Sequence, residues 1–334
     1  MPNNIPVMIS GVGFYVPETV VTNDDISTLV ETSDEWIRTR TGIEERRVVS
    51  GEENSVFLGV NAANNVLSHT KVNPLDIDLI ISATSIPAKA YPSVACEIQA
   101  QIGADNAVAF DVTAACSGLI YVMSIAKAYI SCGMYKKVLL VMTDANSKFV
   151  DWTDRSVCCI FGDGAGAMLL EPSVDGVDDI VEIDLTAMGK LGDYISLEIS
   201  GKNCPLAEPN EERPLHIHMA GRDVYKFVMT YLPEKINKTL ENANMTADEI
   251  DYFIPHQANL RITDALTERI GFNKDRVIVN IQKYGNTSAA SVPIAMTEAI
   301  QDGKIKLPCT AFLTGFGAGM TCGNAIVKLR KGIA

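Results

Sequence analysis

The sequence repeats one order of strands and helices, and this repeat restricts the fold more than any other feature. The first half has strand-like or helical patterns at 77–84, up to Gly103, then at 107–112, 117–133 and 138–143. The second half has them at 250–254, up to Gly271, then at 277–281, 287–303 and 310–314. Two such units predict a pseudo-symmetric α/β protein with parallel-rich sheets covered by helices. Chance likeness of two ordinary βαβ units is the alternative.

Cys116 lies in a short turn between the run at 107–112 and the helical pattern that starts at Ser117. Unpaired backbone N–H groups and the positive end of a helix dipole favour a thiolate at such a position, so Cys116 is a candidate nucleophile. The alternative is a buried cysteine that acts as a small apolar residue. Position alone leaves both readings open.

A nucleophilic cysteine needs partners that manage protons and stabilise negative charge on oxygen. His256 directly follows the strand at 250–254 and precedes a helix, so it is expected at the carboxyl end of a parallel strand, where ligand sites gather. The spacing of 170 residues between Gly133 and Gly303 places Asn286 at the position that corresponds to Cys116. We therefore expect Cys116, His256 and Asn286 at one sheet edge. They could form a thioester and stabilise an enolate without a metal.

The other distinctive segments have weaker chemical meaning. His216 and His218 could share a strand face, but no third ligand is suggested nearby, so we predict no metal site; His69 is expected at the surface. The irregular stretch at 188–219 is either a lid or binding loop, or a solvated surface excursion. The glycine-rich segments at 161–170 and 316–320 open no helix and do not predict phosphate binding.

Composition limits the partners of the chain. Its 334 residues are 47% hydrophobic, but no run approaches about 18 apolar residues, and the N-terminus lacks the pattern of a secretory signal. We therefore expect a cytoplasmic protein. The eight cysteines form no C-x-x-C pair, which predicts reduced thiols. A net charge of −13 disfavours nucleic acid and membrane, so an anionic partner would need a local basic patch.

Several long motifs resemble the β-ketoacyl-acyl-carrier-protein synthase III family. They are Thr-Ser-Asp-Glu-Trp-Ile at 32–37, Arg-Thr-Gly-Ile at 40–43, Ala-Ala-Cys-Ser-Gly at 114–118, Phe-Gly-Asp-Gly-Ala-Gly-Ala at 161–167, Pro-His-Gln-Ala-Asn-Leu-Arg at 255–261 and Gly-Asn-Thr-Ser-Ala-Ala-Ser-Val-Pro at 285–293. The resemblance spans nearly the whole chain. Motifs of this length in the right order are more specific than a lone glycine pattern.

This resemblance implies a thiolase-like, five-layer αβαβα fold with a cysteine half at 1–175 and a histidine–asparagine half at 176–334. It also implies a homodimer that needs no cofactor and condenses a short acyl-CoA, acetyl-CoA first, with malonyl-acyl-carrier protein in fatty-acid synthesis. Cys116 would be the nucleophile, and His256 and Asn286 would stabilise the enolate. The oxyanion hole would be the N–H groups of Cys116 and Ala318, where the family often has glycine.

The resemblance also assigns binding residues. Trp36 and Arg155 would enclose the CoA adenine, although Trp36 alone would be read as a half-buried surface aromatic. The CoA contacts implied are Trp36, Arg40, Thr41, Arg155, Arg222 and Asn259. The carrier-protein contacts implied are Lys226, Gln257, Ala258, Asn259, Leu260 and Arg261. These cations would supply a basic patch, but each taken alone would be read as a solvated surface charge.

Two residues depart from the family pattern. Tyr91 stands where the family has an apolar residue that borders the partner subunit's acyl pocket, and Cys322 stands where a tryptophan is common. Two other functions remain as alternatives: a related condensing enzyme of secondary metabolism with another thioester or acceptor, and a non-catalytic module that binds acyl-CoA or carrier protein. The complete set of Cys116, His256 and Asn286 argues against the second.

Overall fold

The computed structural model describes residues 4–198, 206 and 215–334. Its first sheet has five strands, in the spatial order β1 (Val7–Tyr15), β7 (Gly164–Pro172), β6 (Val138–Asp144), β4 (Leu79–Ala83) and β5 (Val108–Val112). Strand β4 runs parallel to β5 and β6, whereas β7 is antiparallel to both of its neighbours. Strand β1 continues through Gly11 and Gly13, where the sequence suggested a break, with a bulge after Ile9.

The second sheet has four strands, in the order β11 (Tyr252–Pro255), β12 (Cys309–Gly317), β13 (Thr321–Leu329) and β8 (Ile180–Ala187), and only β11 and β12 are parallel. The strand predicted at 277–281 is wrong, because it is reduced to one bridge between Phe253 and Val277. The Gln257 amide donates to Ile278 O and accepts from Asn280 N, at 3.2 and 3.1 Å. It thereby occupies backbone groups that a longer ladder would pair.

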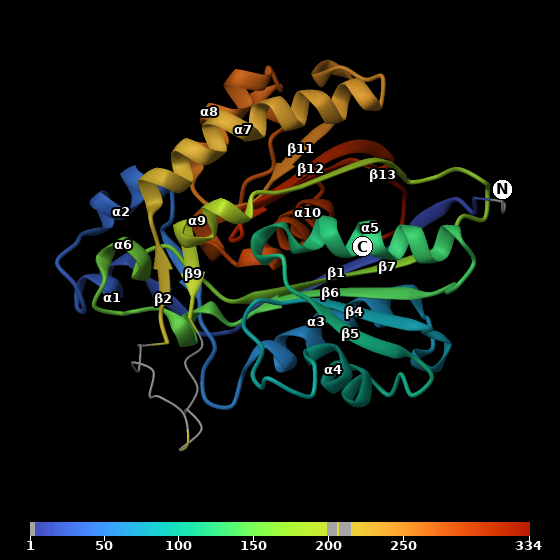
Figure 1. The fold of residues 1–334 in the computed structure, drawn as a ribbon, viewed down its shortest axis with the longest axis horizontal. Coiled ribbons are helices and arrows are strands. Elements are labelled where there is room, and N and C mark those ends of the chain that lie inside the picture. The colour runs from blue at the N-terminus through green and yellow to red at the C-terminus, as the bar shows by residue number, and fades with distance from the viewer. Residues whose placement is uncertain (1–3, 199–205, 207–214) are drawn as a thin grey trace.

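Helices form three layers around the two sheets (Figure 1). Helices α5 (Gly118–Ser131) and α10 (Ser291–Gln301) lie between the sheets, and both bury apolar side chains against them. Helices α3 (Ser55–Thr70) and α4 (Val94–Ile102) cover the outer face of the first sheet, and α7 (Gly221–Asn242) and α8 (Leu260–Ile270) cover the second. The predicted five-layer αβαβα arrangement is confirmed.

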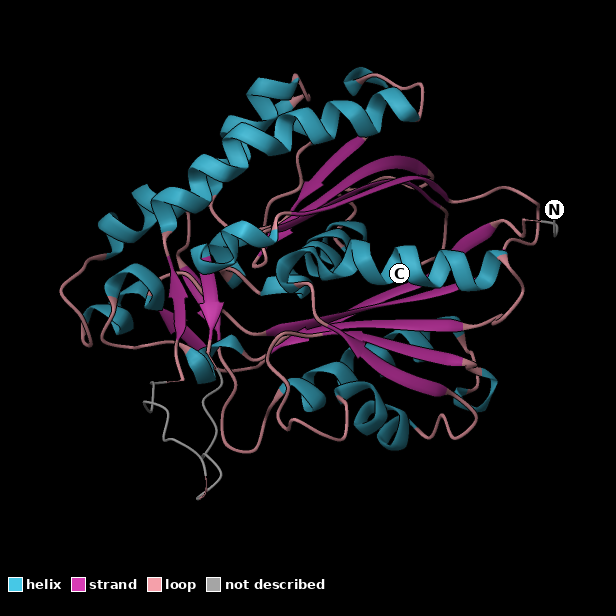
Figure 2. Ribbon diagram, viewed as in Figure 1, coloured by secondary structure: helices cyan, strands magenta, loops and turns pink. Residues whose placement is uncertain are grey.

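Smaller elements lie at one side of the layers. They are β2 (Val20–Thr22), α1 (Asn23–Ser27), α2 (Asp34–Thr41), β3 (Glu45–Arg47), α6 (Arg155–Cys158), α9 (Ile281–Tyr284), β9 (Ile195–Leu197) and β10 (Ile217–Met219). Strands β9 and β10 pair as a separate two-stranded sheet, at the left of Figure 2. Most of the irregular stretch at 188–219 lies outside the described residues. In the part that is described, we find no helix with the length and apolarity of a membrane span.

Glycines end the predicted helices as the sequence indicated. Gly103 and Gly271 are the left-handed C-caps of α4 and α8, with φ angles of 73° and 88°. Gly133 and Gly303, with φ angles of 78° and 71°, each follow the C-cap residue of α5 and α10. These positions favour glycine because a Cβ destabilises this conformation.

The internal repeat is real at the level of elements, but the predicted match of Cys116 with Asn286 is wrong. The short 3-10 turns that lead into α5 and α10 are Ala115–Ser117 and Ser288–Ala290, which are 173 residues apart. The spacing falls to 170 at Gly133 and Gly303 because α10 has 11 residues and α5 has 14. Asn286 therefore precedes its turn, whereas Cys116 lies within its own.

The two sheets come from separate parts of the chain, residues 7–172 and residues 180–329. Both contribute to one apolar core, in which residues such as Leu140 of β6 and Leu313 of β12 are fully buried together with the apolar faces of α5 and α10. A hydrogen bond from Val12 N to Ile333 O, at 2.7 Å, further ties β1 to the C-terminal segment. Division into halves at residue 175 stays a prediction.

Glu298 of α10 holds the segment before Asn286 in place. Its carboxylate is buried and accepts hydrogen bonds from Lys283 Nζ and Tyr284 Oη at 2.6 Å and from Asn280 Nδ2 at 3.0 Å. Burial alone would raise the pKa of Glu298, but these donors outweigh burial and lower it. The ionised carboxylate therefore stabilises the fold.

We predict that Glu298→Ala lowers the free energy of unfolding by about 3 kcal/mol at pH 7, because it leaves three buried donors without their acceptor. The folded pKa lies below the usual 4.5, so this contribution is present above pH 4.5 and is lost as the pH falls through the folded value. Urea denaturation of both proteins measures it. Lys304→Ala, which breaks the exposed pair with Asp302, is the control and should change stability by less than about 0.5 kcal/mol.

Candidate active site

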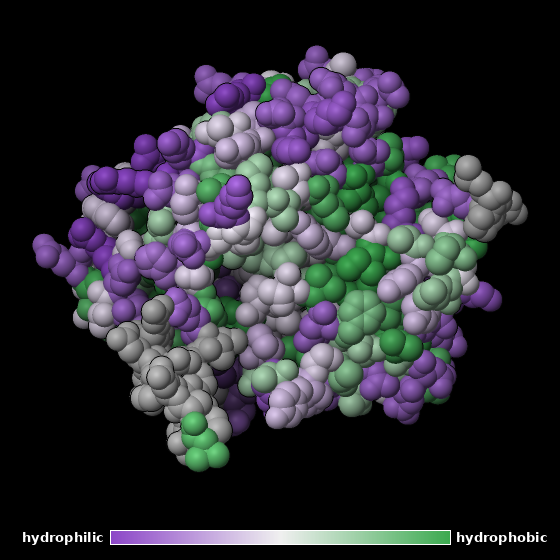
Figure 3. Space-filling view, viewed as in Figure 1, coloured by the Kyte–Doolittle hydropathy of each residue, from purple (hydrophilic) through white to green (hydrophobic). Residues whose placement is uncertain are grey.

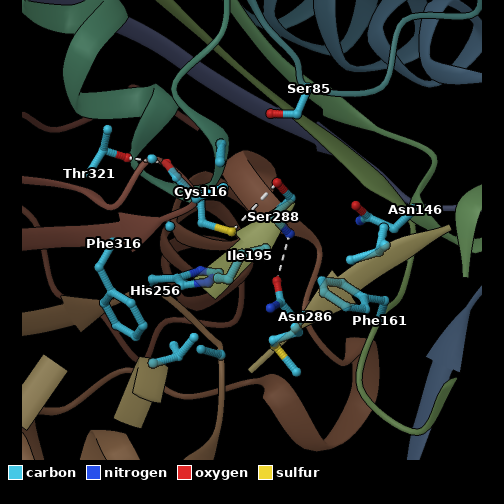
Figure 4. A pocket seen from close by; sticks show the side chains of 18 of the residues that line it. Ser85, Cys116, Asn146, Phe161, Ile195, His256, Asn286, Ser288, Phe316 and Thr321 are labelled. Atoms are coloured by element: carbon cyan, nitrogen blue, oxygen red, sulfur yellow. Dashed lines mark hydrogen bonds between the residues drawn. The ribbon is translucent and has the colours of Figure 1, made fainter. Parts of the chain in front are cut away.

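A cavity of about 570 Å³ opens at the carboxyl edges of both sheets, and Cys116, His256 and Asn286 all line it. Cys116 comes from the turn between β5 and α5, His256 directly follows β11, and Asn286 lies between α9 and the turn before α10. Figure 4 shows the three side chains converging on one space. The structure thus brings together the three residues that the sequence placed at one edge.

Cys116 is held by a strained turn. Ala115, the residue before it, has a φ of 44°, which non-glycine residues rarely adopt and which is typical of functional sites. The Cys116 Sγ lies 3.7 Å from Ser288 Oγ (Figure 4). Burial raises the pKa of the Cys116 thiol to about 12, so the cysteine is a thiol at neutral pH even though it lies near a helix start.

The end of β12 packs directly against this turn. A Cβ on Gly317 would lie 2.6 Å from Cys116 N, so only glycine permits this approach. The approach brings Ala318, the next residue, to the cavity wall beside Cys116. Thr321 fixes the same turn, because its hydroxyl lies 2.8 Å from Ser117 Oγ and donates to Ala318 O at 3.0 Å.

His256 is buried and held from both sides. Its Nδ1 lies 2.6 Å from Ser291 Oγ, which also accepts from Gln257 N at 3.4 Å. The Ser291 hydroxyl hydrogen is then available for His256 Nδ1, which leaves the imidazole N–H on Nε2. The Phe316 ring packs edge-on against the imidazole, with centroids 5.2 Å apart. Burial lowers the pKa of His256 to about 3, so the ring is neutral.

Asn286 is positioned through its own backbone and the neighbouring turn. Its N–H donates to Ile160 O, and its carbonyl accepts from Gly162 N, both at 2.9 Å. Its side-chain Oδ1 accepts from Ser288 N at 2.8 Å (Figure 4). The amide Nδ2 is therefore the part of the side chain that remains available as a donor to a ligand in the cavity.

Much of the cavity wall was not predicted. Apolar residues of β9 and β10 line it, namely Ile195, Leu197, Ile217 and Met219. They belong to the irregular stretch, whose mostly polar sequence gave no strand pattern. Ser85 and Asn146 also line the cavity and follow β4 and β6, so the rule that places ligands at the ends of parallel strands could have found them.

The predicted CoA residues gather around Trp36. The guanidinium carbons of Arg40 and Arg155 lie 4.6 and 4.7 Å from the centroid of its ring. Asn259 lines the cavity and donates to Arg40 O at 2.9 Å, which connects this cluster to the cavity. Arg222 is exposed at the start of α7, beside the cavity residue Gly221.

Two predicted ligand contacts are corrected by burial. Thr41 is 6% exposed, and its hydroxyl donates to Ile37 O and accepts from Ile43 N, so it ends helix α2 instead of facing a ligand. Gln257 is 1% exposed, and its amide is bound to the backbone of 255, 278 and 280. It cannot contact a docking protein in this arrangement.

The remaining docking residues are accessible in part or in full. Ala258 and Asn259 lie at the cavity, Leu260 is half-buried, and Arg261 and Lys226 are exposed. Hydrophilic side chains gather over α7 and α8, at the top of Figure 3. Among the described residues, neither Lys226 nor Arg261 has an ion-pair partner.

Tyr91 lies outside the cavity of its own chain. Its side chain is 86% exposed on the loop between β4 and α4. His216 lies 3.6 Å from Asp151 Oδ2, and His69 Nε2 lies 2.9 Å from Gly332 O at the surface. Within residues 4–198, 206 and 215–334, no group of three or more potential metal ligands comes together.

Two family profiles match the chain. One, described as 3-oxoacyl-[acyl-carrier-protein (ACP)] synthase III, matches residues 110–189, and its C-terminal counterpart matches residues 240–329. A relative from Natranaerobius thermophilus, beta-ketoacyl-[acyl-carrier-protein] synthase III, is 42% identical over 323 residues, which are 96% of this chain and 98% of the relative. The chain belongs to the synthase III family.

Solved structures of the synthase III family agree with this assignment. The 3-oxoacyl-[acyl-carrier-protein] synthase III of Aquifex aeolicus VF5 has a TM-score of 0.89 and 41% identity, and the match covers 97% of this chain and all of that one. The priming β-ketosynthase of the R1128 polyketide pathway has a TM-score of 0.91 and 32% identity, with 99% and 98% covered. The resemblance seen in the sequence motifs is confirmed.

We predict that His256 makes this synthase III chain less stable in acid. Its folded pKa of about 3 lies below the usual 6.5, so the unfolded state binds a proton first. Stability is therefore present above pH 6.5 and is lost as the pH falls towards 3, by about 2 kcal/mol at pH 5.

The variant His256→Gln cannot be protonated, so its free energy of unfolding should fall less between pH 7 and pH 5 than that of the wild type. Urea denaturation at both values measures this difference. His69→Gln, which changes an exposed histidine, should keep the wild-type pH dependence. Equal losses in the wild type and in His256→Gln would contradict the buried neutral imidazole.

Proposed function

We propose that this chain catalyses the decarboxylating condensation of a short acyl-CoA, acetyl-CoA first, with malonyl-acyl-carrier protein to form a 3-ketoacyl-acyl-carrier protein, through an acyl–Cys116 intermediate. This is the reaction that initiates fatty-acid synthesis. One observation carries the proposal: a single cavity presents a thiol, a neutral imidazole and a carboxamide, in a chain that matches synthase III relatives over nearly its whole length. No cofactor is required, because the CoA thioester is a substrate.

In the first half of the reaction, the Cys116 sulfur attacks the acyl carbonyl carbon and CoA leaves as the thiol. The negative charge that develops on the carbonyl oxygen needs donors fixed in advance. The N–H groups of Cys116 and Ala318 are the proposed donors, and the close approach of Gly317 to Cys116 N supports this pairing. Alanine at 318 keeps a backbone N–H.

In the second half, malonyl carrier protein loses CO2 and its α-carbon attacks the acyl–Cys116 thioester. The electrons released by decarboxylation collect on the malonyl thioester oxygen as an enolate. His256 Nε2–H and Asn286 Nδ2–H are the proposed donors to this oxygen, because Ser291 and Ser288 already occupy the other polar atoms of these side chains. Two neutral donors stabilise the enolate without being deprotonated by it.

The CoA nucleotide is proposed to bind at Trp36. An adenine can stack on the indole in place of the Arg155 guanidinium, which then covers the other face of the base. Arg40, Arg222 and Asn259 lie around this position and the cavity mouth. A cytoplasmic location is part of the proposal, and the seven described cysteines are all free, as expected in a reducing compartment.

The carrier protein is proposed to dock on α7 and the start of α8, through Lys226, Arg261, Leu260, Ala258 and Asn259. These exposed cations provide the local basic patch that a chain of net charge −13 needs in order to attract an acidic partner. The patch lies beside the cavity because Ala258 and Asn259 line it. The malonyl arm can therefore reach Cys116 from this side.

A homodimer is also proposed. Strand β5 is an edge strand of the first sheet, its Val108 is 50% exposed, and unpaired backbone groups at such an edge are available to a second copy. Pairing of two β5 edges would join the first sheets of both copies. The exposed Tyr91 lies on the loop before α4, which packs on β5, so it is placed to approach the partner subunit's acyl pocket.

A second candidate function is condensation in secondary metabolism, which the likeness to the priming β-ketosynthase of a polyketide pathway favours. Both functions use an acyl–cysteine and the same donors. They differ in the primer and the acceptor. A panel of acyl-CoA primers against carrier-protein and free-thioester acceptors therefore separates them.

We predict that acetyl-CoA alone adds one acetyl group to the wild type, on Cys116, and that Cys116→Ser loses this adduct and lowers the condensation rate by at least about 10³-fold. Mass spectrometry of the intact protein and its peptides measures the adduct. Cys132→Ser removes an exposed cysteine outside the cavity and should behave as the wild type. Condensation at the wild-type rate by Cys116→Ser would refute the proposal, and absence of any adduct would favour the non-catalytic binding module.

We predict that Lys226→Glu combined with Arg261→Glu raises the KM for malonyl carrier protein by at least about tenfold, because two cations of the docking patch become anions. The acetylation rate of Cys116 by acetyl-CoA should change much less. Lys136→Glu is the matched control, since Lys136 is exposed just before β6, at the opposite end from the cavity. A KM that does not change would place the docking surface elsewhere.

A further inference from the structure

The thiol of Cys116 must lose its proton before it attacks, and the neighbouring histidine is poorly placed to take it. The Nδ1 of His256 faces the Ser291 hydroxyl, and its Nε2 already carries the imidazole hydrogen in this arrangement. The acceptor in contact with the thiol is instead Ser288 Oγ, 3.7 Å from Cys116 Sγ. A serine hydroxyl can accept this proton only if it passes its own to a base.

Asp144 is the base that the structure places behind Ser288. It is the last residue of β6 and is fully buried. Its Oδ1 accepts hydrogen bonds from Ser85 N, Thr84 Oγ1 and Ile86 N, at 2.8, 3.0 and 3.2 Å, which hold the carboxylate in its ionised form.

The other oxygen of Asp144, Oδ2, is buried and accepts no hydrogen bond of normal geometry from the described residues. Burial raises the pKa of Asp144, and the nearby Ser288 hydroxyl is the strongest of the groups that oppose this rise. The Asp144 charge also acts on Cys116 and on the buried Asp163, the other titratable groups of this region. A buried carboxylate with one open oxygen and a raised pKa suits a temporary proton acceptor.

We propose that Ser288 and Asp144 form a proton relay that deprotonates Cys116 during acylation. The proposal rests on the acyl-transfer function proposed above. It makes Ser288 a catalytic residue, since it touches the reacting sulfur, and Asp144 the residue that acts through it.

The step is balanced in protons and electrons. The Cys116 S–H proton passes to Ser288 Oγ while the Ser288 hydroxyl proton passes to Asp144 Oδ2. The freed sulfur electron pair forms the new S–C bond to the acyl carbon, and the bond between that carbon and the CoA sulfur breaks. Its electron pair leaves on the CoA sulfur, which recovers the proton from Asp144 through Ser288. The products are acyl–Cys116 and CoA thiol.

The relay and a simple charge effect predict opposite results for Asp144→Asn. A carboxylate beside a thiol disfavours the thiolate, so its removal alone would make Cys116 more reactive. If Asp144 takes the proton, the same change makes Cys116 less reactive. Ser288→Ala tests the other member, and its backbone is compatible with alanine because Ala115 adopts the corresponding φ of 44°, against 54° for Ser288.

The experiment measures alkylation of Cys116 by iodoacetamide at pH 7 in the wild type, Ser288→Ala and Asp144→Asn, in the absence of any CoA compound. We expect both variants to react about 10²-fold more slowly, and to approach the wild-type rate as the pH rises towards that at which hydroxide removes the proton. Single-turnover condensation from the pre-acetylated proteins should change by less than about 3-fold. Ser291→Ala removes the hydroxyl beside His256 and should slow that second reaction but not the alkylation.

Faster alkylation of Asp144→Asn, or unchanged alkylation of Ser288→Ala, would overturn the relay. If Asp144→Asn does not fold, as judged by circular dichroism, Ser288→Ala alone decides. Failure of the wild type to accept acetyl from acetyl-CoA would reject the proposed function but not the relay, because alkylation needs no CoA.

Discussion

The contact between two short helical turns is the constraint on which the active site depends. The turns Ala115–Ser117 and Ser288–Ala290 each lead into a helix of the middle layer and pack against one another. In each turn the first residue, Ala115 or Ser288, has a positive φ, a strain that the surrounding core must offset. The contact sets Cys116 from the first half against Ser288 from the second, and Ser288 N in turn holds Asn286.

The chemistry of the cavity uses burial and neutral donors in place of charge. Burial keeps His256 neutral and Cys116 protonated, so each proton transfer needs a fixed path. Backbone groups and hydroxyls supply those paths, and their directions are set by Ser288, Ser291 and Thr321. Exposed cations lie on α7 and α8, outside the cavity, where they can attract an acidic partner without altering the pKa of the buried groups.

Local sequence signals predicted the elements well where backbone chemistry determines them. Gly103 and Gly271 marked helix ends because glycine tolerates the left-handed cap, and His256 was placed correctly because it follows a buried strand. The strand at 277–281 failed because the Gln257 side chain, four residues past the start of β11, binds the backbone there, a long-range contact with no local pattern.

The burial of Thr41 and Gln257 and the cavity wall from β9 and β10 were missed for the same physical reason. Motif matching assigns a residue to a ligand but does not show which atoms the fold itself already occupies. The offset between Cys116 and Asn286 was wrong because one shortened helix, α10, shifts the repeat by three residues. Tertiary packing decides all of these features.

The most direct test of the central claim, that the two halves build one site around Cys116, is a crystal structure of the protein after reaction with acetyl-CoA. We expect a thioester on Cys116 Sγ, with its carbonyl oxygen within about 3 Å of the N–H groups of Cys116 and Ala318. His256 and Asn286 should then lie across the cavity, free to receive the second substrate. An acetyl group on another residue, or a thioester oxygen turned away from both N–H groups, would contradict the account.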